Sequence, residues 1–319
     1  MIRALYAPKD GAPRRVDDRA EIERLFKARE GCLWVDLEAP TKDEQAILTS
    51  VCGLHELAVE QCAGHAAHPR LADFGGYVYV VVHAVGSVLP LKSTEIDVFL
   101  TPHALVTYRE EPVGLVEDLR RRAEAVPALM GRGPDRLLAE LLDLLAEEYL
   151  ERAELLDTAL DQVEDKLFKQ AGRPALRDIF HLKKDILGFR RRVGPLREIL
   201  HRLSRGDIPS VTDEERVLFR DVHDRVYRVT EMLETFRDVL AGAMEVYLTM
   251  LSHRTNEIVR VLTVFSIILM STSLIAGIYG MNVEGLPMAG HPLGFWGLVA
   301  VMVGLGVGLL AYFRHRRWI

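Results

Sequence analysis

The spacing of hydrophobic positions changes along the chain, and its first part alternates between strand-like and helix-like patterns. Short runs of β-branched and aromatic residues, bounded by Gly, Pro or charge, are typical of strands. The four runs are 33–37, 77–82, 96–100 and 104–108. Two stretches have helical spacing, namely 42–51 and 115–125. The turn-like break at 101–103 predicts a hairpin between the last two strands. Residues 1–130 are therefore predicted to form an α/β sandwich.

Beyond residue 131 the pattern becomes that of long helices. Leucines recur at spacings of three and four among charged residues, which predicts an amphipathic helix that ends near 171–174. A second helix follows and ends near 205–209. It has a basic face, which is either a solvated surface or an element that approaches anionic headgroups or senses metal. That face consists of Lys183, Lys184, Arg190, Arg191, Arg192 and Arg197.

A third helix begins at a capping-box pattern, in which Thr212 and Glu215 are spaced to satisfy free backbone donors. Neither Pro nor a clear stop signal follows before residue 279. One unbroken helix would be on the order of 100 Å long, at about 1.5 Å per residue. The sequence therefore predicts a single rod shared by the water-soluble part and the membrane part.

Two uncharged apolar stretches lie near the C-terminus, at 261–279 and 295–313. Each is long enough to cross a hydrocarbon core of roughly 30 Å as a helix. Basic residues precede the first stretch and follow the second, whereas the loop 283–294 has none. These residues are Arg254, Arg260, Arg314, Arg316 and Arg317. The positive-inside rule thus predicts that the N- and C-termini are cytoplasmic. The expected location is the cell inner (plasma) membrane.

Composition describes the remainder of the chain. With 319 residues, 27% charged residues and a net charge of -6, roughly the first 250 residues are expected to fold in water around their own core. The chain has no excess of basic residues that would indicate binding to nucleic acid. The segment 1–20 is charged and is not expected to be a secretory signal. The three cysteines are expected to be buried, inert thiols. The predicted domains are 1–130, 131–256 and 257–319, with spans at about 258–279 and 295–313 and an outer loop at 280–294.

One face of the first span is small or weakly polar. Its positions are Asn256, Leu262, Ser266, Met270, Ser273 and Gly277. Small residues allow close helix packing, and a polar face can also line a pore, so both readings stay open. Two spans cannot enclose a lumen, so a pore requires several copies around an axis. The pore reading therefore predicts a homo-oligomer.

Several segments together carry a family resemblance. They are Ser252-His253-Arg254-Thr255-Asn256-Glu257, Val261-Leu262-Thr263, Ala276-Gly277-Ile278-Tyr279-Gly280-Met281-Asn282 and Arg316-Arg317-Trp318. The chain resembles the CorA-type divalent-cation transport family in these segments. The order of parts is also similar along nearly the whole chain. A Gly-Met-Asn motif at the end of the first of two C-terminal spans, after Tyr279, is a specific signal.

The resemblance implies a funnel-shaped homopentamer whose first spans line a pore. Gly280, Met281 and Asn282 would form the outer ion filter. Two further sets of residues would act within the pathway: polar rings and an apolar gate. They are Ser273, Asn256 and Glu245 for the rings, and Leu262 and Met270 for the gate. Mg²⁺ dehydrates reluctantly, so an amide ring suits a hydrated ion, and an apolar ring can close a pore by expelling water.

The chain departs from the family pattern at two places. Asp221 matches an acidic stalk residue of a regulatory metal site, but the partner region 83–87 contains no carboxylate. The outer loop 283–288, where Glu284 can attract cations, has a Gly-x-Pro form that looks more like the zinc-transporting ZntB branch, and Ser271 stands where many relatives have Pro. Transport of Mg²⁺ or Co²⁺, and transport of Zn²⁺ coupled to protons, both remain open.

Two other classes of protein are alternatives to a transporter. A membrane-anchored enzyme would need a reactive constellation, and the sequence has no Gly-rich phosphate loop, serine elbow or paired metal-binding histidines on a helix. No enzymatic activity and no tightly bound cofactor are expected. A structural or signalling oligomer without transport would share the long helices and the anchors. It would not need Asn282.

Overall fold

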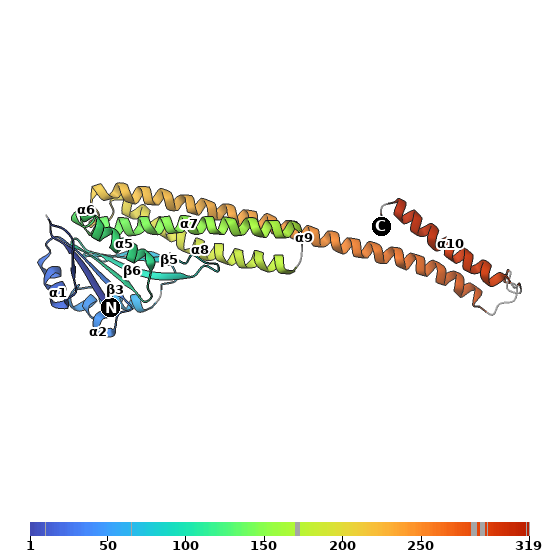
Figure 1. The fold of residues 1–319 in the computed structure, drawn as a ribbon, viewed down its shortest axis with the longest axis horizontal. Coiled ribbons are helices and arrows are strands. Elements are labelled where there is room, and N and C mark those ends of the chain that lie inside the picture. Colours follow the sequence, from blue (N-terminus) through green and yellow to red (C-terminus); the bar gives the residue numbers. More distant parts are fainter. Residues whose placement is uncertain are drawn as a thin grey trace. The chain divides into compact units, whose positions relative to one another are not determined.

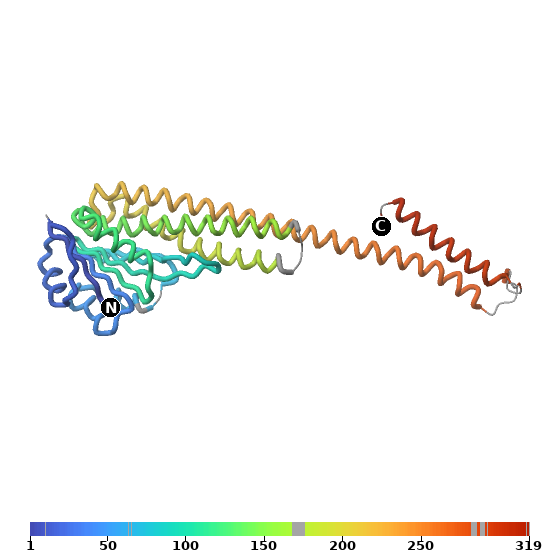
Figure 2. The backbone as a smooth tube through the Cα atoms, in the orientation of Figure 1, coloured from blue at the N-terminus to red at the C-terminus, as the bar shows by residue number. Residues whose placement is uncertain are grey.

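The computed structural model describes residues 1–9, 11–64, 66–169, 173–281, 286, 287, 291, 293–316 and 318. The chain divides into two compact units, Met1–Ala243 and Met244–Ile319. Figure 2 shows the course of the backbone through each of them. The two units are described separately below.

The first unit contains a seven-stranded sheet in the order β2-β1-β3-β7-β6-β5-β4. Its strands are β1 (Ile2–Ala7), β2 (Arg14–Val16), β3 (Cys32–Glu38), β4 (Arg70–Asp73), β5 (Val78–Val85), β6 (Ser93–Leu100) and β7 (Ala104–Arg109). Only the pairing of β3 with β7 is parallel among the pairs described. The four strands predicted from the sequence are confirmed, and so is the β6–β7 hairpin.

Helices cover both faces of this sheet (Figure 1). One face packs its alternating apolar side chains, including Val35, Val81 and Phe99, against residues of α1 (Arg19–Ala28), α3 (Ile47–Ser50) and α4 (Glu56–Ala63). The other face contacts α7 (Pro134–Lys169), which also packs on α5 (Gly114–Ala125) and α6 (Pro127–Gly131). This arrangement confirms the predicted α/β sandwich.

The sequence prediction missed several short elements. Strands β1, β2 and β4 and helices α1 and α4 were not foreseen. The stretch 42–51 forms two short helices, α2 (Lys42–Gln45) and α3, separated at Ala46, because Thr41 and Glu44 form a capping box that favours a first turn of its own. The three cysteines are free and buried, as expected.

Three long helices follow the sheet. Helices α7 and α8 (Arg173–Arg205) pack against each other in the first unit, and α9 is one helix over Asp213–Tyr279, as predicted. The start of α9 differs from the expected capping box. Thr212 donates its hydroxyl to Asp135 Oδ2 at 2.7 Å, and Glu215 pairs with Arg132 and Arg136. The loop before α9 is therefore tied to the start of α7.

A buried ion network joins β3, β7 and α5. Asp36 accepts hydrogen bonds from Arg109, from Arg120 at 2.6 Å and from Thr107 at 2.7 Å. Trp34 donates to Thr107 at 3.1 Å, and the Arg120 guanidinium lies over its ring. A buried carboxylate costs free energy unless it is paired and hydrogen-bonded, and Asp36 is both.

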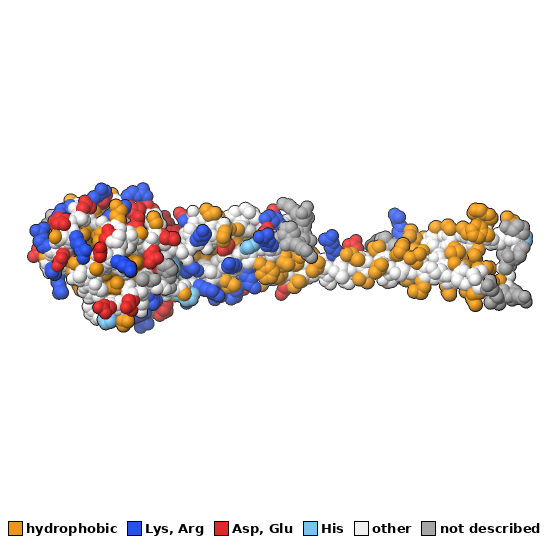
Figure 3. Space-filling model, turned by 90° about the horizontal axis from the view of Figure 1, so that it is seen from below, with side chains coloured by type: hydrophobic (Ala, Val, Ile, Leu, Met, Phe, Trp, Pro, Cys, Tyr) orange, Lys and Arg blue, Asp and Glu red, His pale blue; other side chains and the backbone are white. Residues whose placement is uncertain are grey.

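The second unit contains the C-terminal part of α9 and the helix α10 (Gly294–His315). Both α9 and α10 include a window long and apolar enough to cross a membrane, and almost none of either window is buried inside the protein. Figure 3 shows hydrophobic side chains along the face of this unit that it presents. A soluble protein rarely exposes so large an apolar surface, so lipid is its natural surrounding.

Candidate functional site: the membrane segment of α9

Helix α10 covers one face of α9 in the second unit. Val264 and Phe313 are buried, and Ile267, Ile268 and Ile275 are half-buried. A Cβ added at Gly306 of α10 would lie 3.7 Å from Ile268 Cγ2, which is ordinary van der Waals contact. Glycine is a residue that lets membrane helices approach closely. Ile268 therefore marks the packed face of α9.

The six positions of the predicted stripe lie away from that face. All of them are exposed, including Leu262 at 61% and Met270 at 70%. At about 100° per residue, Ser266, Met270 and Gly277 lie roughly 160–180° around the helix from Ile268. The stripe is thus opposite the face that α10 covers, and no described residue of the same chain covers it.

Hydroxyl groups along this part of α9 differ in whether they bond within the helix, and Thr263, roughly 140° around the helix from Ile268, donates to the carbonyl of Val259 at 2.8 Å. On the packed side, Ser271 donates to the carbonyl of Ile267 at 2.8 Å and Thr272 donates to that of Ile268 at 3.0 Å. Such bonds satisfy a hydroxyl within its own helix. Within the described part of the chain, the hydroxyls of Ser266 and Ser273 make no such bond. They remain available to water or to a hydrated ion.

Helix α9 ends next to the predicted filter. The N–H of Gly280 donates to Ala276 O at 2.9 Å, and the N–H of Met281 donates to Ile278 O at 3.3 Å. The backbone hydrogen bonds thus change from a four-residue to a three-residue spacing where the helix ends. Gly280 and Met281 are exposed. Asn282 and Glu284 lie outside the described residues. The two polar positions nearer the N-terminal end, Asn256 and Glu245, are exposed on α9.

The predicted regulatory residue Asp221 lies on α9 in the first unit. Its side chain is 73% exposed and forms an ion pair with Arg225 at 3.5 Å, and Arg225 also pairs with Asp143 at 2.8 Å. Burial raises the pKa of Asp143, and the attraction of Arg225 partly offsets that rise. A guanidinium thus already occupies the place where a cation would bind these two carboxylates.

Carboxylates that sequence reasoning missed lie near the end of β5. A cavity of about 580 Å³ beside residues 84–87 is lined by Glu147, Glu148 and Glu151 of α7 and Asp118 of α5. Glu148 accepts a hydrogen bond from the N–H of Val85 at 2.7 Å, and burial raises its pKa. Only the i, i+4 spacing of 147 and 151 hinted at this cluster. No group of three or more such ligands is arranged to hold a metal ion in the described ranges.

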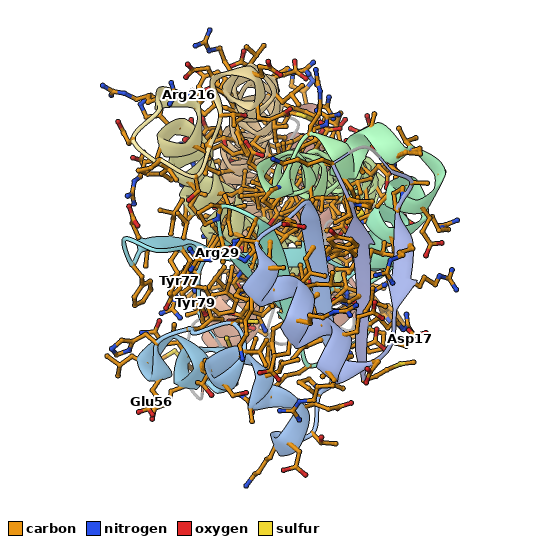
Figure 4. The ribbon with its side chains drawn as sticks, turned by 90° about the vertical axis from the view of Figure 1, so that its left-hand side faces the viewer. Asp17, Arg29, Glu56, Tyr77, Tyr79 and Arg216 are labelled. Carbon is orange, nitrogen blue, oxygen red and sulfur yellow. The ribbon has the colours of Figure 1, made fainter. Side chains whose placement is uncertain are left out.

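A second buried carboxyl group lies on the α4 side of the sheet. Tyr79 donates to Asp97 Oδ1 at 2.5 Å, and Arg70 donates to the Tyr79 hydroxyl at 3.3 Å. Figure 4 shows Tyr77 and Tyr79 on the side of the sheet where Glu56 of α4 lies. Burial, more than any neighbouring charge, raises the pKa of Asp97 to about 7.

Helix α9 has an exposed apolar surface suited to lipid, a side that packs on α10 and a stripe of small or weakly polar residues. These features are typical of membrane channels and transporters. The family model described as "CorA-like Mg2+ transporter protein" matches residues 29–316, and the chain belongs to the CorA family. Members of this family are metal cation transporters and not enzymes. The chain is accordingly a divalent metal cation transporter.

Three comparisons illustrate this membership. The cobalt/magnesium transport protein CorA of Thermotoga maritima is 30% identical over 272 residues, which cover 84% of this chain and 77% of that protein. The zinc transport protein ZntB of Yersinia enterocolitica is 22% identical over 303 residues, covering 93% and 90%. The solved CorA magnesium transporter of Methanocaldococcus jannaschii superposes with a TM-score of 0.86 at 23% identity, covering 100% and 99%, which shows a shared fold.

Proposed function

We propose that five copies of this chain form a pore that moves Mg²⁺, and also Co²⁺, across the inner (plasma) membrane, with both termini in the cytoplasm. The observation that carries the proposal is the position of the stripe on α9. Its small and polar residues lie opposite the α10-packed face, so a ring of α9 helices can turn the stripe inward while α10 faces lipid. The number five rests on the family resemblance.

The proposed roles follow the order of residues along α9. Asn282, with Gly280 and Met281, forms an outer ring of amides that binds the ion through its water shell. Ser273, Asn256 and Glu245 form polar rings further along. The remaining pair, Leu262 and Met270, closes the pathway, because an apolar ring excludes water until the helices move apart. Glu284 raises the local cation concentration at the outer mouth.

The proposal also includes the predicted domain organisation, with a cytoplasmic α/β domain at 1–130, cytoplasmic helices at 131–256 and a transmembrane domain at 257–319. Asp221 is retained in it as a ligand of a regulatory metal ion, and that ion would have to displace the guanidinium of Arg225. The cargo ions Mg²⁺, Co²⁺ or Zn²⁺ are substrates, and no tightly bound cofactor is invoked.

Zinc transport is the second candidate, because the outer loop has the Gly-x-Pro form and a zinc transport protein is among the relatives. Reconstituted vesicles separate the two. Uptake is measured for Mg²⁺, Co²⁺ and Zn²⁺, with and without a proton gradient. Mg²⁺ and Co²⁺ uptake that needs no proton gradient supports the channel, whereas Zn²⁺ uptake driven by protons supports the carrier.

The filter assignment is tested in the same vesicles with Asn282→Ala. We expect loss of selective flux, because the amide ring that meets the hydrated ion is gone. Phe295→Ala, an exposed residue at the start of α10, is the matched control and should keep its flux. Selective flux retained by Asn282→Ala would overturn the filter. Absence of any flux in the unchanged protein would favour an anchored scaffold.

A further inference from the structure

The outer faces of α7 and α8 have opposite charge. On α7 an exposed row of carboxylates, the acidic stripe, occupies positions three or four apart. It consists of Glu147, Glu151, Glu154, Asp157, Asp161 and Asp165. At about 100° per residue these positions lie within roughly 120° of one another, opposite the buried side chains of Tyr149, Leu156 and Leu160. The stripe extends over about 27 Å of helix.

Helix α8 has a complementary row, the basic stripe. Arg177, Lys184 and Arg191 are seven residues apart, so they lie on nearly one line, and Lys183 is exposed beside them. Lys and Arg side chains gather along this hairpin on the side that Figure 3 presents. From Arg177 to Arg191 the row covers about 21 Å, which is similar to the length of the acidic stripe.

The central charges of the two stripes are not neutralised within their own chain. In the part of the chain that the structure describes, Glu154, Asp157 and Asp161 have no ion-pair partner within 4.0 Å, and neither do Lys183, Lys184 and Arg191. Other charges of the same hairpin are paired, as Lys166 is with Asp178 at 2.7 Å. The central charges of the two stripes are therefore available to an outside partner, and the two stripes are similar in length.

We infer that the basic stripe of one subunit docks on the acidic stripe of a second copy of this chain. In a closed ring each subunit presents one surface to one neighbour and a different surface to the other, and two stripes of opposite charge on one hairpin fit that geometry. An anionic lipid surface would attract α8 but repel α7. This inference rests on the proposed homo-oligomer and adds the contact that orients its cytoplasmic parts.

Such a contact is electrostatic and exposed, so it depends on ionic strength. Each exposed pair contributes modestly, and four pairs together change a subunit dissociation constant by about tenfold. Salt screens charges over about 10 Å at 0.1 M, so the contact weakens as salt rises. Its main effect is on the choice and register of the neighbouring subunit.

Cross-linking between differently tagged chains tests the contact in the full-length protein. One chain carries Asp157→Cys and the other Lys184→Cys, and a short bismaleimide joins them only across a subunit boundary. The native thiols do not interfere, because all three are buried and burial raises the pKa of Cys32 and Cys52 to about 12. We expect cross-linked dimers that contain one chain of each tag and that decline at high salt. Leu57→Cys on α4 replaces Asp157→Cys as the control and should give none.

Charge reversal supplies a second measurement. Lys184→Glu with Arg191→Glu should raise the subunit dissociation constant about tenfold, and adding Asp157→Lys with Asp161→Lys to the same chain should restore it. Restoration excludes misfolding as the cause. An oligomer that conducts ions but gives no mixed cross-link would overturn this inference alone. So would an oligomer whose subunit dissociation constant does not change on charge reversal. A monomeric chain by native mass spectrometry would instead overturn the proposed function.

Discussion

Gly306 of α10 lies against Ile268 of α9, so closely that an added Cβ would be 3.7 Å from the Ile268 Cγ2 atom. This contact fixes which side of α9 faces its own α10 and which side is left for other copies. The stripe of small and polar residues is on the free side. The assignment of the pore-lining face therefore depends on the packing between these two residues.

Enlarging Gly306 should disturb that packing. Gly306→Leu would force extra side-chain volume into the α9–α10 contact, and overpacking costs about 1–3 kcal/mol. We expect a lower melting temperature in detergent and reduced flux. Gly306→Ala should be tolerated, since its Cβ would make an ordinary contact. Gly304→Leu is the control, because no atom lies within 4 Å of a Cβ added there. Equal effects of the two leucine variants would contradict the packing role.

Shortening the proposed gate should make the pore leak. Leu262→Ala with Met270→Ala would remove exposed apolar side chains from the stripe and widen the ring, so that water enters more easily. We expect basal flux to rise about tenfold, equivalent to ~1.4 kcal/mol of barrier. Phe265→Ala removes an exposed apolar side chain from outside the stripe and should leave flux unchanged. Flux unaltered in the double variant would place the constriction elsewhere.

Hydrophobic patterning predicted the elements whose signals are local and long. Val78–Val85 is a continuous buried run of mostly β-branched and aromatic residues, and α9 has no Pro before Tyr279. A local sequence signal was therefore enough to identify each of them. The short elements were missed for a physical reason. Strand β2 has only three residues, too few to show a recognisable alternation, so its formation depends on tertiary packing.

The stripe on α9 could be recognised from the sequence because its positions, such as those from Leu262 to Gly277, recur along one helix, and its role in a pore remains a proposal. It was not predictable where side chains from different elements meet. Arg225 lies between Asp143 and Asp221, and Glu148 of α7 reaches the N–H of Val85 on β5. The contacts of Arg225 with Asp143 and of Glu148 with Val85 join residues more than sixty positions apart, and no spacing rule connects such residues.

Removing Arg109 should destabilise the first unit strongly. Its guanidinium is fully buried and pairs with Asp36, Glu38 and Glu117. Arg109→Met would leave the buried carboxylate of Asp36 with less compensation, at a cost of about 3–5 kcal/mol. Guanidinium unfolding of the full chain in detergent, followed by Trp34 fluorescence, measures the loss. Arg15→Met breaks the exposed pair with Glu124 and should cost far less, because water screens that pair. Similar costs for both would refute the network's importance.

Removing Arg225 should create a cation-responsive site. Arg225→Gln would leave Asp143 and Asp221 without the guanidinium that they share, so a divalent cation could bind between them. We expect Mg²⁺ to raise the melting temperature of this variant by about 2–4 °C more than that of the unchanged protein, or roughly 1 kcal/mol. Arg228→Gln, an exposed position on the same helix, is the control. Identical shifts in all three proteins would exclude Asp221 from metal sensing.

The pH dependence of stability should reveal Asp97. Burial raises the pKa of its carboxyl group from 3.8 to about 7, so between these values the folded protein holds a proton that the unfolded chain has released. Its contribution to stability is then present at low pH and lost as pH rises toward 7, by on the order of 4 kcal/mol. Asp97→Asn stays neutral and keeps an acceptor for Tyr79. As pH rises, the unfolding free energy of the unchanged protein should therefore fall relative to that of the variant. The exposed variant Asp17→Asn should not show this gain. Parallel pH profiles for Asp97→Asn and the unchanged protein would mean that Asp97 is already ionised in the fold.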